Sequence, residues 1–174
     1  MSQQPVAEAI AILEQAMRNE VQGRRFYLRV AERVRDRRGQ ELFRAIADDE
    51  ADHLRLLQTQ RDAIATGRPW ISIEAAKTLP RYDLTIFPEA DAIALSEAAT
   101  DTDALRLAMD YERQGYELYD RAAAATGDAT AKAVFRFLAG EENRHFTLFQ
   151  DNLNYLNSSA SWQFDDWEKQ IFEG

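Results

Sequence analysis

Apolar residues recur at helical spacing along most of the chain, and their pattern divides the amino-terminal half into two amphipathic segments. The first stripe follows Pro5, a residue that suits a first helical turn, and predicts a helix to about Arg37. Gly39 is predicted to mark a turn. A second stripe begins at Leu42 and predicts a helix that ends before Gly67. These two helices are expected to form an antiparallel hairpin.

The carboxyl-terminal half shows the same pattern after a long interruption. Between residues 67 and 99 three prolines stand among aromatic and aliphatic side chains, which predicts a long, partly buried connection with a short helical piece near residues 89–99. Thr100 is a candidate N-cap for a third long helix. Residues 127–128 are expected to close it, and a fourth helix fades near Asn157. Short connections within hairpins and a long one between them predict an all-α antiparallel four-helix bundle.

The two predicted hairpins, residues 5–66 and 100–157, are copies of each other at an offset of 92 positions. Identical residues at this offset include Met17 and Met109, Gly23 and Gly115, Tyr27 and Tyr119, Arg29 and Arg121, Phe43 and Phe135, and Ala47 and Ala139. The repeat predicts an internal pseudo-twofold axis. We expect one bundle domain over residues 1–157, followed by a tail over residues 158–174.

The tail has an amphipathic pattern of its own. Phe164, Trp167 and Ile171 fall on one face of a short predicted helix. Two interpretations stay open, namely docking onto the bundle and binding of the tail to a partner subunit or shell.

Composition narrows the possible functions. A chain of 174 residues is large enough to bury one core, and no stretch approaches the roughly 18 apolar residues of a membrane-spanning helix. The amino terminus lacks the pattern of a secretory signal, so we expect a cytoplasmic protein. The absence of cysteine excludes disulfides, thiolate zinc sites and iron–sulfur clusters. A net charge of −9 argues against nucleic acid as a partner. Eight arginines between residues 24 and 44 are interpreted as the carboxyl end of a helix rather than an anion site.

Six polar residues interrupt the apolar stripes at core-facing positions. They are Glu20, Glu50 and His53 in the first hairpin and Glu112, Glu142 and His145 in the second. The two histidines are the only ones in the chain, and each ends a Glu-x-x-His motif that lies 30 residues after a single glutamate. Unpaired buried carboxylates are unfavourable, so four at one level require cations. Two divalent ions would balance their four negative charges.

The spacing also predicts how the six residues would share two ions. Side chains three positions apart on a helix lie close enough to bind a common centre. Glu50 and Glu142 are therefore predicted to bridge two metals, each histidine to cap one metal, and Glu20 and Glu112 to be terminal ligands. Oxygen-rich ligation with one imidazole per ion suits iron or manganese better than structural zinc. The alternative is that all six are exposed or structural.

Two further pairs of residues lie near the predicted centre. Tyr27 and Tyr119 each follow a terminal glutamate by two turns, where a hydroxyl could hydrogen-bond a ligating carboxylate. The alternative is two ordinary core tyrosines. Gly23 and Gly115 could leave space for a small oxidant or could serve close helix packing.

These motifs resemble those of a known family. The pattern Met17-x-x-Glu20…Tyr27 with Phe43-x-x-x-Ala47-x-x-Glu50-x-x-His53, together with its second copy, is similar to the ferritin-like superfamily and, within it, to the rubrerythrin-like group, over about residues 5–157. The resemblance implies a ferritin-like bundle and a di-iron carboxylate site that reacts with hydrogen peroxide or dioxygen, in a homodimer. Rubrerythrins carry a further glutamate where this chain has Gly115, which argues against their redox-linked ligand switching. They also carry a rubredoxin domain with four cysteines, so an external electron donor is implied here.

The sequence therefore predicts an oxidoreductase that oxidises bound Fe(II) with hydrogen peroxide or dioxygen, with manganese as the alternative metal. Iron storage by a ferroxidase subunit is a second possibility. A structural or cargo protein with an incidental metal site is a third.

Overall fold

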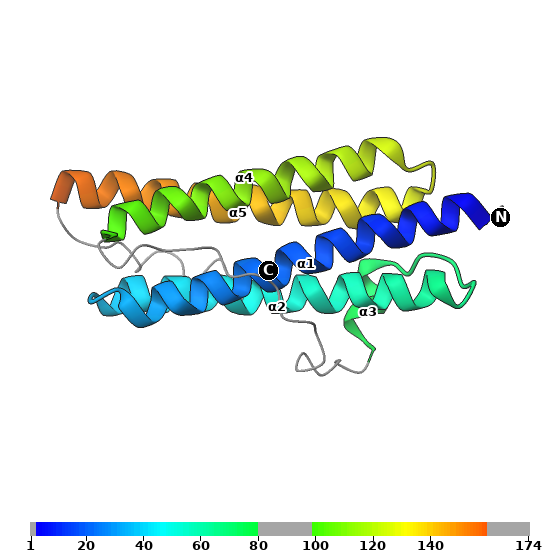
Figure 1. Ribbon diagram of the computed structural model, residues 1–174, viewed down its shortest axis with the longest axis horizontal. Coiled ribbons are helices and arrows are strands. Elements are labelled where there is room, and N and C mark those ends of the chain that lie inside the picture. The colour runs from blue at the N-terminus through cyan, green and yellow to red at the C-terminus, as the bar shows by residue number, and fades with distance from the viewer. Residues whose placement is uncertain (1–2, 80–98, 160–174) are drawn as a thin grey trace.

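The computed structural model describes residues 3–79 and 99–159, and within them the chain is helical. The helices are α1 (Gln3–Arg33), α2 (Arg37–Ala65), α3 (Ile73–Lys77), α4 (Asp101–Ala125) and α5 (Ala129–Ser159). Figure 1 shows α1 and α2 as one antiparallel hairpin lying along a second hairpin of α4 and α5, with the two short turns at opposite ends of the bundle. The predicted all-α, ferritin-like four-helix bundle is confirmed. No helix in these two ranges is both long and apolar enough to cross a membrane.

The first turn lies earlier than predicted. Helix α1 ends at Arg33 and α2 begins at Arg37, so Gly39 is a buried residue inside α2 and the predicted turn at this glycine is wrong. The side chain of Asp36 instead caps α2, accepting a hydrogen bond of 2.8 Å from the backbone N–H of Arg38. An aspartate that satisfies a free N–H of the first turn fixes a helix start without any need for glycine.

This turn also divides the arginine-rich segment. Its first members belong to the carboxyl-terminal part of α1, whereas Arg37, Arg38 and Arg44 lie on α2. Arg37 pairs with Glu41 one turn later at 2.7 Å. The interpretation of this segment as a single helix end is therefore correct only for its first half.

The ends of the second hairpin agree with the sequence. Thr100 and Asp103 form a reciprocal capping box at the start of α4. Asp128 accepts hydrogen bonds of 2.9 Å from the backbone N–H groups of Thr130 and Ala131 at the start of α5. Both predicted boundaries are confirmed.

The chain after α2 is anchored to the bundle before it leaves the described region. The side-chain amide of Gln60 donates to the carbonyl of Ile71 at 2.8 Å and accepts from its N–H at 2.9 Å. Trp70 packs edge-on against Phe135, with ring centroids 5.5 Å apart. The predicted burial of this connection by its aromatic residues is thus seen at its start. Two predicted elements lie outside the described residues. They are the helical piece near residues 89–99, apart from its last residue, and the tail helix. The boundary between bundle and tail stays a prediction.

The core consists of two apolar clusters separated by a polar layer. Each long helix contributes a series of three residues spaced seven positions apart. The first belongs to one cluster, the second is a glutamate of the polar layer, and the third belongs to the other cluster. The four series are Leu13, Glu20 and Tyr27; Phe43, Glu50 and Leu57; Leu105, Glu112 and Tyr119; and Phe135, Glu142 and Phe149. The heptad spacing of the sequence therefore places four carboxylates at one level, with apolar packing above and below.

Candidate metal centre

The six predicted site residues come together in this polar layer. None exposes more than 4% of its surface. They form two overlapping groups, and within each group the four potential ligand atoms lie within 4.8 Å of one another. The first group is Glu20, Glu50, His53 and Glu142, and the second is Glu50, Glu112, Glu142 and His145. Glu50 and Glu142 belong to both groups, which is the arrangement that two bridging carboxylates require.

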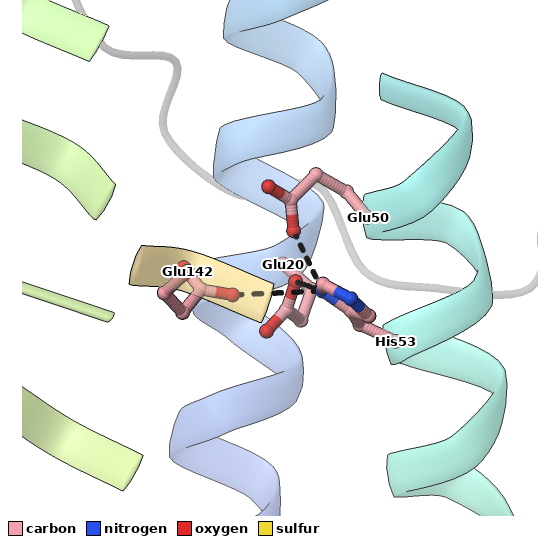
Figure 2. Close-up of side chains that lie close together, drawn as sticks. All are labelled: Glu20, Glu50, His53 and Glu142. Atoms are coloured by element: carbon pink, nitrogen blue, oxygen red, sulfur yellow. Dashed lines mark ion pairs between the residues drawn. The ribbon is translucent and has the colours of Figure 1, made fainter. Parts of the chain in front are cut away.

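The first group surrounds the inner nitrogen of His53, as Figure 2 shows. His53 Nδ1 lies 3.5 Å from Glu20 Oε2, 3.4 Å from Glu50 Oε2 and 3.5 Å from Glu142 Oε1. These separations exceed normal hydrogen-bond lengths. They suit donors that share one ion, because atoms each about 2.0–2.2 Å from a metal lie roughly 2.8–3.6 Å from one another in octahedral or tetrahedral coordination.

The second group has a similar arrangement around His145, with two carboxylates close to the inner nitrogen. Its Nδ1 lies 3.6 Å from Glu50 Oε1 and 3.4 Å from Glu112 Oε2. The two imidazole rings are nearly parallel, with centroids 5.6 Å apart. Both histidines therefore direct Nδ1 into the carboxylate layer.

Each of the six residues has one buried ligand atom without a hydrogen-bond partner. These atoms are Glu20 Oε2, Glu50 Oε1, His53 Nδ1, Glu112 Oε2, Glu142 Oε1 and His145 Nδ1. Buried polar atoms are nearly always satisfied, and each that is not costs about 1–3 kcal/mol. Six such atoms converging in one layer fit a pair of cations.

Burial and mutual repulsion perturb the carboxyl groups. Burial, followed by the negative charge of Glu50, raises the pKa of Glu20 to about 8. Burial also raises the pKa of Glu112, and burial with the charge of Glu112 raises the pKa of Glu142. Burial and the charge of Glu142 oppose ionisation of Glu50, but the neighbouring Glu20, His145 and His53 side chains outweigh them, and the pKa of Glu50 is lowered. Without metal, the layer therefore retains protons at neutral pH.

The pKa values of both histidines are raised in spite of their burial. Burial alone would lower both pKa values, but Glu141, Glu142 and Glu20 raise the pKa of His53 well above its ordinary value. The charge of Glu112 and the carboxylate of Asp49 do the same for His145. Cations that bind Nδ1 must displace these protons, so metal binding and proton release are linked.

Two buried tyrosines donate across the bundle to the single glutamates. The hydroxyl of Tyr27 donates to Glu112 Oε1, and that of Tyr119 donates to Glu20 Oε1. Each tyrosine thus serves the glutamate of the other hairpin, where the sequence had placed each near the glutamate of its own helix. One oxygen of each glutamate accepts from a tyrosine and the other is unpartnered. Burial raises both tyrosine pKa values, so both hydroxyls remain donors.

The structure adds two acidic residues that the sequence prediction missed. His145 Nε2 lies 3.1 Å from Asp49 Oδ2, and His53 Nε2 lies 4.0 Å from Glu141 Oε2. Arg144 lies between the two carboxylates. Asp49 and Glu141 each precede one of the two glutamates that belong to both groups, and are themselves 92 positions apart. Extending the repeat comparison from identical residues to acidic ones would have found them.

The two glycines near the centre face occupied space. A Cβ at Gly23 would lie 2.7 Å from Tyr111 Cε1, and one at Gly115 would collide with Glu142 Oε2. Side chains therefore fill the volume beside both glycines. Of the two interpretations, close packing describes these positions, and the oxidant-space interpretation is not supported.

Comparison with known proteins agrees with this geometry. The profile of the family described as Rubrerythrin matches residues 11–153. This chain belongs to the rubrerythrin family. Rubrerythrins are ferritin-like di-iron carboxylate proteins, and the two buried Glu and His groups of this member could hold metal. The matched domain extends over the whole of both hairpins except the ends of α1 and α5.

A solved structure has the same fold. A hypothetical protein from Pyrococcus furiosus is 23% identical, with a TM-score of 0.66 over 85% of this chain and 89% of that chain. At this identity the likeness establishes the fold alone. No curated protein matches the chain.

Proposed function

We propose that this rubrerythrin-family protein is a non-haem di-iron oxidoreductase in which Glu20, Glu50, His53, Glu112, Glu142 and His145 bind two iron ions. The observation that carries the proposal is the convergence of one unpartnered, buried ligand atom from each of these six residues. Two divalent ions balance four carboxylates when both imidazoles are neutral. Manganese suits the same donors and is the alternative metal.

Each residue has a role set by its position. Glu50 and Glu142, which belong to both groups, would be shared by the two ions, and Glu20 and Glu112 would each hold one ion. His53 and His145 would each bind one ion. Bound iron would supply the electrons that reduce hydrogen peroxide or dioxygen. Tyr27 and Tyr119 orient the terminal glutamates, and the apolar clusters on either side of the layer keep bulk water out.

Reduction of the oxidised centre requires a separate electron donor. The chain contains no cysteine and hence no rubredoxin-type iron site of its own. We infer an external donor, and a cytoplasmic homodimer as the working form. A large hollow assembly in solution would instead favour iron storage, and a chain that binds iron without reacting would favour the structural or cargo alternative.

Stopped-flow absorbance tests the proposal. Fe(II)-loaded protein is mixed with hydrogen peroxide and, separately, with air-saturated buffer, and iron oxidation is followed. Wild-type protein is expected to oxidise iron faster than Glu50→Ala with at least one oxidant. Glu117→Ala is the matched control, because Glu117 is an exposed glutamate on α4 that pairs with Arg121 on its own helix. Equal rates for wild type and Glu50→Ala with both oxidants would refute the catalytic role.

A further inference from the structure

A single arginine joins the two carboxylates that lie on the outer side of the histidines. Arg144 Nη2 donates to Asp49 Oδ2 at 3.0 Å and to Glu141 Oε2 at 2.7 Å. All three side chains are partly buried, with 30%, 23% and 25% of their surface exposed. One guanidinium nitrogen therefore links α2, which carries Asp49, to α5, which carries Glu141 and Arg144 itself.

This arginine breaks the internal repeat. Asp49 and Glu141 are repeat mates, but the position that corresponds to Arg144 in the first hairpin is Asp52. Asp52 accepts a hydrogen bond from Arg55 on its own helix. Two symmetry-related carboxylates thus share one cation, and that cation belongs to only one hairpin.

The two histidines consequently have unequal outer partners. Asp49 Oδ2 lies 3.1 Å from His145 Nε2, within hydrogen-bond range, and the same oxygen also accepts a hydrogen bond from Arg144. Glu141 Oε2 lies 4.0 Å from His53 Nε2, beyond that range, and is held by Arg144 at 2.7 Å. The oxygen that could reach His53 is the one that Arg144 holds.

We propose that Arg144 makes the two metal positions inequivalent by holding Glu141 away from His53 while Asp49 supports His145. The inference rests on the proposed function, because it requires that both histidines bind metal through Nδ1. An imidazole bound in this way carries a proton on Nε2, and a carboxylate that accepts this proton orients the ring and strengthens it as a ligand. His145 receives this support and His53 does not. Arg144 is a positioning residue that touches neither metal ion.

Cobalt(II) titration of matched variants tests the inequality. Asp49→Ala and Glu141→Ala are repeat-related substitutions that each remove one outer carboxylate. Asp49→Ala is expected to weaken binding of one of the two Co(II) ions by roughly 10- to 100-fold, the usual effect of losing a residue that supports a histidine ligand. Glu141→Ala is expected to change neither binding constant by more than about threefold, because Glu141 Oε2 lies 4.0 Å from His53 Nε2, beyond hydrogen-bond range. Equal losses in the two variants would overturn the proposal.

Proton NMR of the Co(II)-loaded protein tests the role of Arg144 directly. In wild type the Nε2 proton of His145 is expected to exchange with water at least about tenfold more slowly than that of His53, since only His145 donates to a carboxylate. Arg144→Met releases Glu141, so the His53 proton should become protected and the difference should disappear. Arg55→Met, which removes the arginine paired with Asp52, is the control and should leave both exchange rates unchanged.

Other outcomes of the NMR experiment have definite meanings. Equal exchange of the two protons in wild type would overturn the proposal. So would an Arg144→Met variant in which only the His145 proton exchanges faster, because Arg144 would then merely support Asp49. Failure of wild-type protein to bind Co(II) would refute the metal centre itself. Binding of two ions with equivalent histidines would instead refute only the role of Arg144.

Discussion

The two hairpins of this bundle are most alike at the metal-facing positions and least alike immediately around them. Both supply one single glutamate, one Glu-x-x-His motif and one tyrosine to the buried layer, which contains two overlapping groups of possible metal ligands. Outside that layer the repeat mates diverge. Tyr111 donates to the backbone carbonyl of Asn19, its own repeat mate, and Arg144 has Asp52 as its counterpart. Under the proposed function, binding of two ions would require similar ligands from the two hairpins, whereas the surrounding residues are free to differ.

The largest expected effect is on the number of bound ions, and it differs between a ligand of both groups and a ligand of one group. Glu142→Ala removes a carboxylate common to both groups and leaves the others to repel one another, so both ions should be lost. Glu20→Ala removes a residue of only one group and should leave about one ion per chain. The loss in Glu142→Ala should exceed the roughly 10- to 100-fold effect of residues that only support a ligand. Elemental analysis after dialysis measures the stoichiometry, with Glu117→Ala as control, and equal stoichiometry in the two ligand variants would contradict the bridging role.

Lowering the pH should have the next largest effect on metal binding, because it protonates the carboxylates of the layer. With a pKa of about 8, Glu20 must lose a proton before it can bind metal below that pH. Metal affinity should fall at least about tenfold for each pH unit below 8, or at least about a hundredfold between pH 8 and pH 6, because the histidines also release protons when they bind metal. Isothermal titration with Mn(II), which does not oxidise readily, measures this slope, and an affinity independent of pH over this window would be the contrary result.

The same shift predicts how the stability of the metal-free protein varies with pH. Glu20 has its pKa raised from 4.5 in the unfolded chain to about 8 in the folded one. Its contribution to stability is therefore fully present below pH 4.5 and is lost as the pH rises through 8. The raised pKa values of His53 and His145 act in the same direction. The thermal midpoint of metal-free protein should fall between pH 5 and pH 8, and added metal should restore it most at the upper end.

The repeat-related glycines offer an intermediate effect that differs between the hairpins. Gly115→Ala pushes a methyl group into the carboxylate of Glu142 and should weaken metal binding. Gly23→Ala pushes it into the ring of Tyr111, away from the ligands, and should lower the free energy of unfolding by about 1–3 kcal/mol with little change in metal binding. Metal titration and urea unfolding of both variants measure the contrast. If Gly23→Ala weakened metal binding as much as Gly115→Ala, the distinction between their surroundings would be wrong.

The smallest effect should be symmetric. Tyr27→Phe and Tyr119→Phe each remove one hydroxyl from a terminal glutamate of the opposite hairpin. Loss of a hydrogen bond to a charged group corresponds to about 1.5–3 kcal/mol before the site relaxes, so each variant should bind metal about tenfold more weakly. A double variant should show the sum of the two effects, because each tyrosine serves a different ion. Strong asymmetry between the single variants would contradict the pseudo-twofold arrangement of the layer.

The bundle, the repeat and the six converging residues can all be predicted from the sequence pattern. Heptad spacing fixes which side chains share a helix face, and the offset of 92 pairs the two hairpins, so Glu20, Glu50 and Glu142 can be recognised from their spacing alone. The first turn was misplaced because glycine is a general turn signal, whereas the cap at Asp36 depends on one local hydrogen bond.

The hairpin that supplies each hydrogen-bond partner of the layer depends on how the helices pack, which the sequence pattern does not reveal. Tyr27 donates to Glu112 rather than to a residue of its own helix, and Arg144 joins Asp49 of α2 to Glu141 of α5. Spacing along a helix defines a face but not the rotation and axial position of the helix opposite. Those quantities are set by the packing of the two apolar clusters, and they place one oxygen 3.1 Å and its symmetry mate 4.0 Å from a histidine.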